Sequence, residues 1–296
     1  MRPVASARNF CLRILEAGDL ETKLAPPPQA AGALVDDFEA FAPIRRMRPG
    51  RARGLGMRSG APRLPGPAAL GDPKARIQCL ARFAHHELMA VELFAWSLLR
   101  WPDVPRGLRR DLLSILFDEQ RHCRLYLARL RALGSDLGEH VLSDYFWKQA
   151  PAIAASSHGV RAFLAAMGLT LEQANLDFTL LYRDAFCRAG DEESAALCQQ
   201  VHDDEIRHVR LAAHWLQTLS EPPGDLVECY RQSVPFPLSA ARAKGRRFDA
   251  GARRRAGLPD AFIEYVRTAR PSQELGRALG GSRPSTPQRD GDGRLP

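Results

Sequence analysis

One eight-residue pattern occurs twice in this chain and restricts its fold more than any other feature. Residues 118–125 read Asp-Glu-Gln-Arg-His-Cys-Arg-Leu, and residues 204–211 read Asp-Glu-Ile-Arg-His-Val-Arg-Leu. Six of the eight positions are identical, at a separation of 86 residues. Each copy lies in a long segment with helical spacing of apolar residues. Positions i and i+3 share one helix face, so each Glu-x-x-His predicts a carboxylate and an imidazole that point inward together.

Four long helices are expected around these two copies. Proline and glycine residues bound the segments, which run over residues 73–100, 105–133, 157–189 and 191–219. The turns within the first pair and within the second pair are short, which predicts two antiparallel hairpins joined by a longer crossover. No strand-like alternation competes with this pattern. The predicted fold class is therefore all-α, with irregular basic extensions at both ends.

The segments outside these helices differ in composition. Residues 1–72 are expected to hold a short helix over 5–24, followed by a wrap rich in Pro, Gly and Arg, and residues 73–220 are expected to form the helical bundle. Residues 221–279 are predicted to be a basic extension with a helix near 259–268. Residues 280–296 are of low complexity, which is typical of a disordered tail.

Basic charge is concentrated in the flanking segments. The chain has a formal charge of +8, yet residues 80–220 contain 15 Lys and Arg against 18 Asp and Glu. The flanking excess forms two clusters: Arg45, Arg46, Arg48, Arg51, Arg53 and Arg58, then Arg242, Lys244, Arg246, Arg247, Arg253, Arg254 and Arg255. Such clusters are most often solvated or paired surface, although they can also contact phosphate. An RNA partner is therefore an alternative rather than the first expectation.

Cysteine and apolar patterns indicate the compartment. The six cysteines include no C-x-x-C pair, which argues against a disulfide framework and a thiolate zinc site. No apolar run approaches the roughly 20 residues that span a bilayer. We expect a cytoplasmic protein with reduced thiols and no membrane partner.

Two further carboxylates can be chosen by their depth in the hairpins. Facing residues of an antiparallel hairpin are equally far from its turn, which pairs Glu87 with Glu119. Glu205 lies 33 residues after Glu172, almost the 32-residue spacing of that first pair. Glu92 and Asp177 each lie five residues further along, off the ligand face, so a structural role is expected for them.

Together these residues make a four-Glu, two-His set. Six converging polar groups would strongly destabilise a helical core without cations. We therefore expect a dinuclear iron centre, or alternatively a dinuclear manganese centre, since carboxylate and imidazole suit both metals. The predicted ligands are Glu87, Glu119, His122, Glu172, Glu205 and His208.

The paired motifs resemble the ferritin-like di-iron superfamily, which includes bacterial multicomponent monooxygenases, acyl-carrier desaturases and rubrerythrins. More closely, residues 85–88, 118–122, 171–172, 204–209 and 241–258 resemble an uncharacterised bacterial family of ferritin-like proteins, over about residues 8–270. This resemblance implies a ferritin-like four-helix bundle. It also implies that Asp118 hydrogen-bonds His208 and that Asp204 hydrogen-bonds His122. Arg121 and Arg207 would then be ion-pair partners behind the ligands.

The first functional expectation is a non-haem di-iron oxygenase or oxidase. No nicotinamide or flavin fingerprint is present, so an external electron donor such as a ferredoxin is implied. The substrate is left open between a small molecule and RNA, and a homodimer is compatible with the sequence. The alternatives are a ferroxidase, a dimanganese protein active on peroxide, an enzyme like the distantly related tRNA hydroxylase, and a purely structural bundle.

Overall fold

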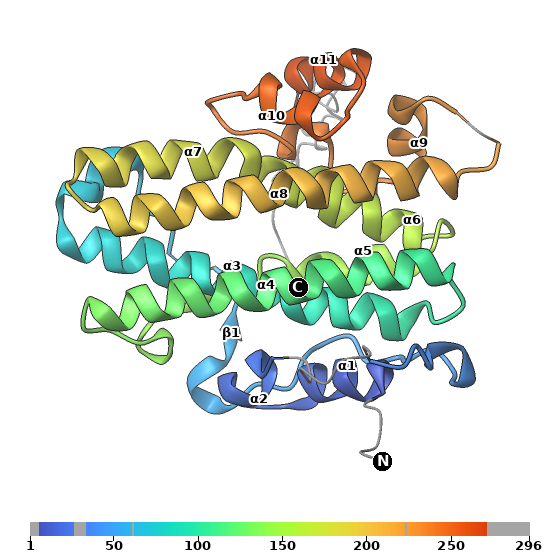
Figure 1. Cartoon of the computed structure of the whole chain (residues 1–296), viewed down its shortest axis with the longest axis horizontal. Coiled ribbons are helices and arrows are strands. Elements are labelled where there is room, and N and C mark those ends of the chain that lie inside the picture. The colour runs from blue at the N-terminus through green and yellow to red at the C-terminus, as the bar shows by residue number, and fades with distance from the viewer. Residues whose placement is uncertain (1–5, 27–33, 61, 223, 271–296) are drawn as a thin grey trace, which may run out of the picture.

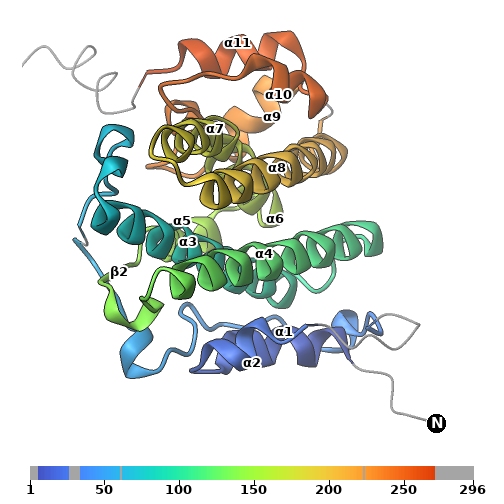
Figure 2. The ribbon, with the colours of Figure 1, turned by 60° about the vertical axis from the view of Figure 1, so that its left-hand side comes forward.

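Two antiparallel helical hairpins form the centre of the molecule (Figure 1, Figure 2). The structure, a computed structural model, describes residues 6–26, 34–60, 62–222 and 224–270. The hairpin helices are α3 (Pro73–Arg100) with α4 (Arg106–Ala132), and α7 (Gln173–Arg188) with α8 (Glu192–Thr218). Helices α4 and α8, which carry the two copies of the repeat, pack against each other. The all-α prediction is confirmed.

Local sequence signals set the ends of these helices. Asp72 and Asp191 accept hydrogen bonds from backbone N–H groups in the first turns of α3 and α8. Gly134 and Gly190 follow the last turns of α4 and α7 with φ of 80° and 71°, a conformation that favours glycine. The boundaries predicted for α3, α4 and α8 consequently lie close to the observed ones.

The third long segment differs from its prediction. It begins at α6 (Val160–Phe163), continues as a π-helical segment η6 (Leu164–Glu172) and then becomes α7. A Cβ atom on Gly168 would clash with the side chain of Ala212, so glycine permits η6 to approach α8 closely. Periodicity analysis assumes uniform α-helix and does not detect a π segment, which is often found at functional sites.

The N-terminal extension covers the α3–α4 hairpin. The single helix predicted over 5–24 is in fact two helices, α1 (Ala7–Glu16) and α2 (Leu20–Leu24), which pack on α3 and α4. The break occurs because Asp19 caps α2 by accepting from the backbone N–H of Thr22.

The C-terminal extension lies on the opposite side, against η6, α7 and α8 (Figure 2). The predicted helix near 259–268 is confirmed as α11 (Asp260–Thr268). Helices α9 (Leu226–Ser233) and α10 (Ala250–Arg255) were not predicted. The predicted disordered tail, 280–296, lies outside the described residues.

Short elements complete the connections. Strand β1 (Met57–Arg58) pairs in parallel with β2 (Leu142–Ser143), which joins the N-terminal wrap to the crossover. The crossover also carries α5 (Ala150–Ala155). The 3₁₀ turns are η1 (Phe38–Ala40), η2 (Arg53–Leu55), η3 (Pro67–Gly71), η4 (Leu137–Glu139), η5 (Trp147–Gln149) and η7 (Ala240–Arg242). Within the described ranges, no helix is long and apolar enough to cross a membrane.

Glu92 attaches the N-terminal extension and the crossover to α3. Its fully buried carboxylate lies 3.0 Å from Nζ of Lys23 and 2.7 Å from Nη2 of Arg51. It also accepts a 2.9 Å hydrogen bond from the indole N–H of Trp147. One buried carboxylate thus holds three segments that are distant in sequence.

Asp177 has the corresponding position in the second hairpin and attaches the C-terminal extension. Arg253, which is fully buried, donates two hydrogen bonds of 2.7 and 2.9 Å to this carboxylate. The backbone N–H groups of Gly245 and Asp249 also donate to it, at 2.8 and 2.7 Å. The expected structural roles of Glu92 and Asp177 agree with these contacts. The view of the basic clusters as surface is wrong for Arg51 and Arg253, because each is buried against a carboxylate.

We predict that Asp177→Asn lowers the free energy of unfolding by about 3–5 kcal/mol, because it leaves the Arg253 guanidinium buried without a counter-charge. Asp260→Asn removes an exposed ion pair with Arg254 and should change it by at most about 1 kcal/mol. Urea unfolding measures both variants, and hydrogen exchange should show faster opening of residues 243–258 in the first. Equal effects in the two variants would contradict the anchoring role of Asp177.

Candidate metal centre

Six buried polar side chains converge between the two hairpins. Helix α4 presents Glu119 and His122, and α8 presents Glu205 and His208, each pair at the i, i+3 spacing of one helix face. The other two carboxylates, Glu87 and Glu172, come from α3 and from the last residue of η6. All six side chains are buried, with exposed fractions of 6% or less.

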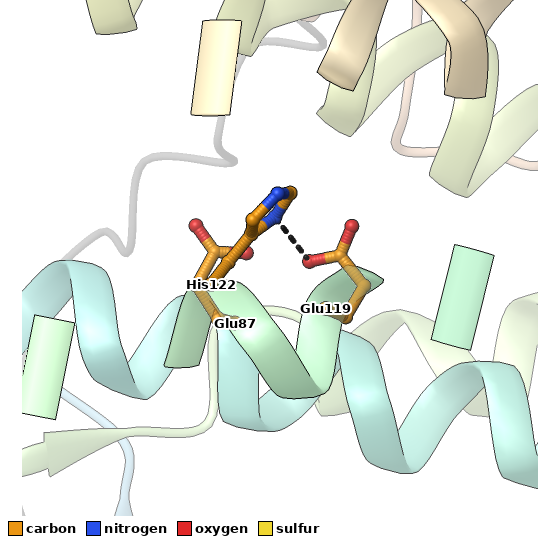
Figure 3. Close-up of side chains that lie close together, drawn as sticks. All are labelled: Glu87, Glu119 and His122. Carbon is orange, nitrogen blue, oxygen red and sulfur yellow. Dashed lines mark ion pairs between the residues drawn. The ribbon is translucent and has the colours of Figure 1, made fainter. Parts of the chain in front are cut away.

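The cluster divides into two groups that share Glu119. In the first group, Glu87, Glu119 and His122 each offer one ligand atom, and these atoms all lie within 4.8 Å of one another. Figure 3 shows these three side chains turned toward one another, with Nδ1 of His122 3.7 Å from Glu119 Oε2. Glu119, Glu205 and His208 form the second group within the same distance limit. Glu119 therefore belongs to both groups of side chains that could hold a metal ion.

Crossed hydrogen bonds orient both imidazoles. Nε2 of His122 lies 3.0 Å from Asp204 Oδ2, and Nε2 of His208 lies 3.1 Å from Asp118 Oδ2. Each aspartate thus contacts the histidine of the opposite helix, as the resemblance implied. A ring that donates from Nε2 presents its Nδ1 lone pair to the cluster.

Arginines neutralise these aspartates from the solvent side. Arg121 donates to Asp204 at 2.7 Å and lies 3.0 Å from Asp118, and Arg207 donates to Asp118. Both guanidinium groups are partly exposed, at 41% and 38%. The two arginines therefore lie behind the histidines, where the resemblance implied ion-pair partners.

Most of the carboxylate oxygens and imidazole nitrogens that could bind a metal ion lack hydrogen-bond partners. Among the described residues, this holds for both oxygens of Glu119 and of Glu172, for Glu205 Oε2 and for Nδ1 of both histidines. Nδ1 of His208 nevertheless lies 3.1 Å from Glu119 Oε1 and 3.5 Å from Glu205 Oε2. A lone pair facing carboxylate oxygens is unfavourable unless a cation lies between them. The donor set therefore fits metal ions that take oxygen and imidazole nitrogen ligands.

The same crowding shifts the pKa values of the metal-free cluster. Burial and the neighbouring Glu119 raise the pKa of Glu87 well above its usual range, and burial together with Glu205 does so for Glu172. Burial disfavours the ionised form of Glu119, but the neighbouring carboxyl group of Glu87 and the two imidazoles lower its pKa well below the usual range. Although burial opposes it, the adjacent carboxylates raise the pKa of His208 to about 10. Without metal, protons supply the positive charge that the cluster needs.

Glu172 lies outside both three-residue groups, although it was predicted as a ligand. Its carboxylate is buried at the end of η6, where burial and the negative charge of Glu205 raise its pKa. The structure thus brings five of the six predicted ligands into the two groups and leaves the sixth adjacent to them.

Sequence reasoning missed Asn175. Its amide donates a 2.8 Å hydrogen bond to Glu205 Oε1, which orients a predicted ligand. The available signal was its position three residues after Glu172, on the same helix face. Four other histidines of the long helices, His85, His86, His202 and His214, lie in neither group.

We predict that Glu172→Gln stabilises the metal-free protein by about 1–3 kcal/mol at neutral pH, because it removes a buried carboxyl group without a partner. The wild-type group has a raised pKa in the folded state, so its contribution to stability is present below about pH 4.5 and is lost as the pH rises. The advantage of the variant should therefore grow between pH 5 and pH 8 in urea unfolding after chelation.

Glu264→Gln is the control, because this glutamate side chain is 60% exposed and should respond little at either pH. Destabilisation by Glu172→Gln at both pH values would show that the carboxylate has a stabilising partner and would contradict its place in the cluster.

Comparison with known proteins places the chain in a family. The chain is similar to a Haemophilus influenzae protein described as "Uncharacterized protein", with 27% identity over 161 residues, which is 52% of this chain and 55% of that protein. The match thus spans about half the length of that relative. No solved structure matches the chain. Residues 17–264 match the family described as "Protein of unknown function (DUF455)", and because this match covers most of the sequence, the chain belongs to the DUF455 family.

Proposed function

We propose that the cluster holds two metal ions, with iron as the first choice, and that the protein is an O₂-dependent oxidase or oxygenase. The observation that carries this proposal is the pair of imidazole Nδ1 atoms that face the shared carboxylate Glu119, each oriented by an aspartate from the opposite helix. A set of charged side chains with a purely structural role, or one exposed to solvent, would not require two buried histidines of this kind. Each of them contacts an aspartate of the opposite helix through Nε2 and has no hydrogen-bond partner at Nδ1 among the described residues.

The two groups assign the ligands of each ion. Glu87, Glu119 and His122 would hold one ion, and Glu119, Glu205 and His208 would hold the other. Glu172, whose pKa burial and the charge of Glu205 raise, would supply a further carboxylate to the ion held by Glu205. Two ferrous ions, when bound there, would supply the electrons that activate O₂.

The chain's own residues would control this chemistry. Asp118 and Asp204 keep the histidine tautomers fixed, and Arg121 and Arg207 balance the aspartate charges. The six side chains of the cluster have exposed fractions of 6% or less, and burial strengthens the electrostatic interactions among them. In a hydroxylation, one oxygen atom enters the substrate and the other leaves as water, with two electrons from an external donor of the ferredoxin type and two protons.

A ferritin-like bundle is part of this proposal. Two hairpins, each with one Glu from its first helix and one Glu-x-x-His from its second, follow the arrangement of ferritin-like di-iron proteins. The family match does not address the metal, so manganese and a ferroxidase activity are the outcomes against which iron-dependent oxygenation is tested. We extend the same proposal to a cytoplasmic location with reduced thiols, since the structure contains six free cysteines.

We predict that anaerobic titration with Fe(II) gives about two ions per chain, because the cluster offers two groups of ligands. His208→Ala should abolish binding of at least one ion, whereas His214→Ala, an exposed histidine six residues later on α8, should bind as the wild type does. Metal analysis after gel filtration provides the measurement.

Exposure of the loaded protein to O₂ then separates the activities. Oxygen uptake that depends on an added electron donor supports the oxygenase. Uptake coupled only to Fe(II) oxidation, with ferric iron retained in a large assembly, would favour the ferroxidase, and a strong preference for Mn(II) would favour peroxide chemistry. Unchanged metal content in His208→Ala would contradict the assigned centre.

A further inference from the structure

A cavity of about 220 Å³ lies directly against the cluster. Glu87, a predicted ligand, and Asn175, which hydrogen-bonds Glu205, are both in its wall. The cavity therefore reaches the cluster from the side of α3 and α7, whereas the crossed aspartates lie between α4 and α8.

The walls of the cavity are largely apolar and aromatic. On α7, Ala174 and Phe178 lie one turn apart on the face that lines it, and α3 contributes Phe83 and His86 in the same way. The crossover supplies Phe146, whose ring is stacked on His86 with centroids 5.1 Å apart and an angle of 20° between the planes. Such walls favour a flat, apolar body that can stack on them or meet their edges.

The volume indicates the size of that body. An apolar cavity of about 150 Å³ is enough to hold benzene. A cavity of about 220 Å³ therefore accommodates a flat body larger than a single six-membered ring, such as a two-ring aromatic system.

One cation at the rim of the cavity has no counter-charge within the part of the chain that the structure describes. Arg242 is exposed and lines the cavity, and its Nη1 donates a long hydrogen bond, 3.5 Å, to the hydroxyl of Tyr145. No carboxylate of the described residues lies within 4 Å of its guanidinium group. Two arginines of the same basic cluster differ from it, because Arg247 pairs with Asp184 and Arg253 pairs with Asp177.

The position of this arginine is fixed by the fold. Arg242 belongs to the turn η7, and the segment that follows it is held on α7 by the hydrogen bonds of Gly245 and Arg253 to Asp177. An unpaired guanidinium held at the mouth of an apolar cavity is a recognition group for an anion.

We propose that this cavity binds a small organic anion, with a flat aromatic body between α3 and α7 and its carboxylate or phosphate on Arg242. As a substrate class, this inference rests on the proposed function, because the ring would then lie beside the metal ligands. As a binding site, it stands without metal, since the cavity walls and Arg242 belong to the protein itself.

The test measures binding of three probes to the full chain after chelation, by isothermal titration. 2-Naphthoate and 2-naphthyl phosphate carry the two anionic groups, and 2-naphthylmethanol is the neutral probe with the same ring. We expect both anions to bind more tightly than the alcohol, and the tighter of the two identifies the natural group.

Three variants identify the site. Arg242→Gln should weaken binding of the anions about five- to tenfold and leave the alcohol unchanged, because only the charge-assisted contact is lost. Arg246→Gln, an exposed arginine that does not line the cavity, is the matched control and should have no effect. Ala174→Phe fills the cavity and should reduce binding of all three probes more than tenfold, while circular dichroism and the metal content of the loaded protein stay at the wild-type level.

The outcomes separate this inference from the proposed function. A protein that binds two metal ions but none of the probes, or that binds them equally well in Arg242→Gln and in the wild type, overturns the inference and leaves the metal centre standing. If the anions bind through Arg242 in a protein that takes up no metal, the result supports the anion site in the cavity and contradicts the proposed function.

Discussion

Burial of carboxylates in a helical core is the constraint on which the rest of this structure depends. An ionised carboxylate removed from water destabilises a fold by several kcal/mol unless a positive charge or several hydrogen bonds accompany it. Six acidic groups are the most deeply buried, each with an exposed fraction of 6% or less: Glu87, Glu92, Glu119, Glu172, Asp177 and Glu205. These carboxylates differ in whether a cationic side chain pairs with them. That difference separates the structural part of the protein from the part that we propose to be functional.

Glu92 and Asp177 are fully compensated. Each lies five residues after a predicted ligand of its hairpin. Each carboxylate contacts a buried cation from an extension, and each also accepts hydrogen bonds from N–H groups of the crossover or of an extension. Their partners also position the cavity walls, because Trp147 precedes α5 in the crossover next to Phe146, and Arg253 follows the segment that carries Arg242. The basic extensions therefore do more than cover the hairpins: their attachment points shape the space beside the cluster. Of the other four carboxylates, Glu119 and Glu172 lack a hydrogen-bond partner in the described part of the chain at both oxygens and Glu205 lacks one at Oε2, which is compatible with the cation binding that we propose.

Sequence patterns predicted the long helices well because their boundaries depend on local chemistry. Asp72, Gly134, Gly190 and Asp191 act within one turn of the helix ends, and the repeat fixes which faces of α4 and α8 turn inward. The depth argument also identified Glu87, since antiparallel helices keep equal distances from their turn. The ligand role of all six residues stays a prediction, because only binding of metal tests it.

Features that depend on contacts between distant segments could not be predicted in this way. The π segment before Glu172 depends on the close approach of Gly168 to α8. Helices α9 and α10 are short and need the surface of the second hairpin to form. Arg242 approaches Tyr145 across 97 residues of sequence, and no local pattern distinguishes it from the paired arginines beside it. The cavity is therefore a property of the folded chain alone.

The measurement that tests the central claim most directly is anomalous diffraction at the iron absorption edge, from crystals of the protein loaded anaerobically with Fe(II). The account predicts two peaks about 3.5–4 Å apart, the separation typical of two-metal sites. Glu119 should lie between them, with Glu87 and His122 at one peak and Glu205 and His208 at the other. A single peak, or iron bound elsewhere while Nδ1 of both histidines stays unligated, would contradict the dinuclear centre.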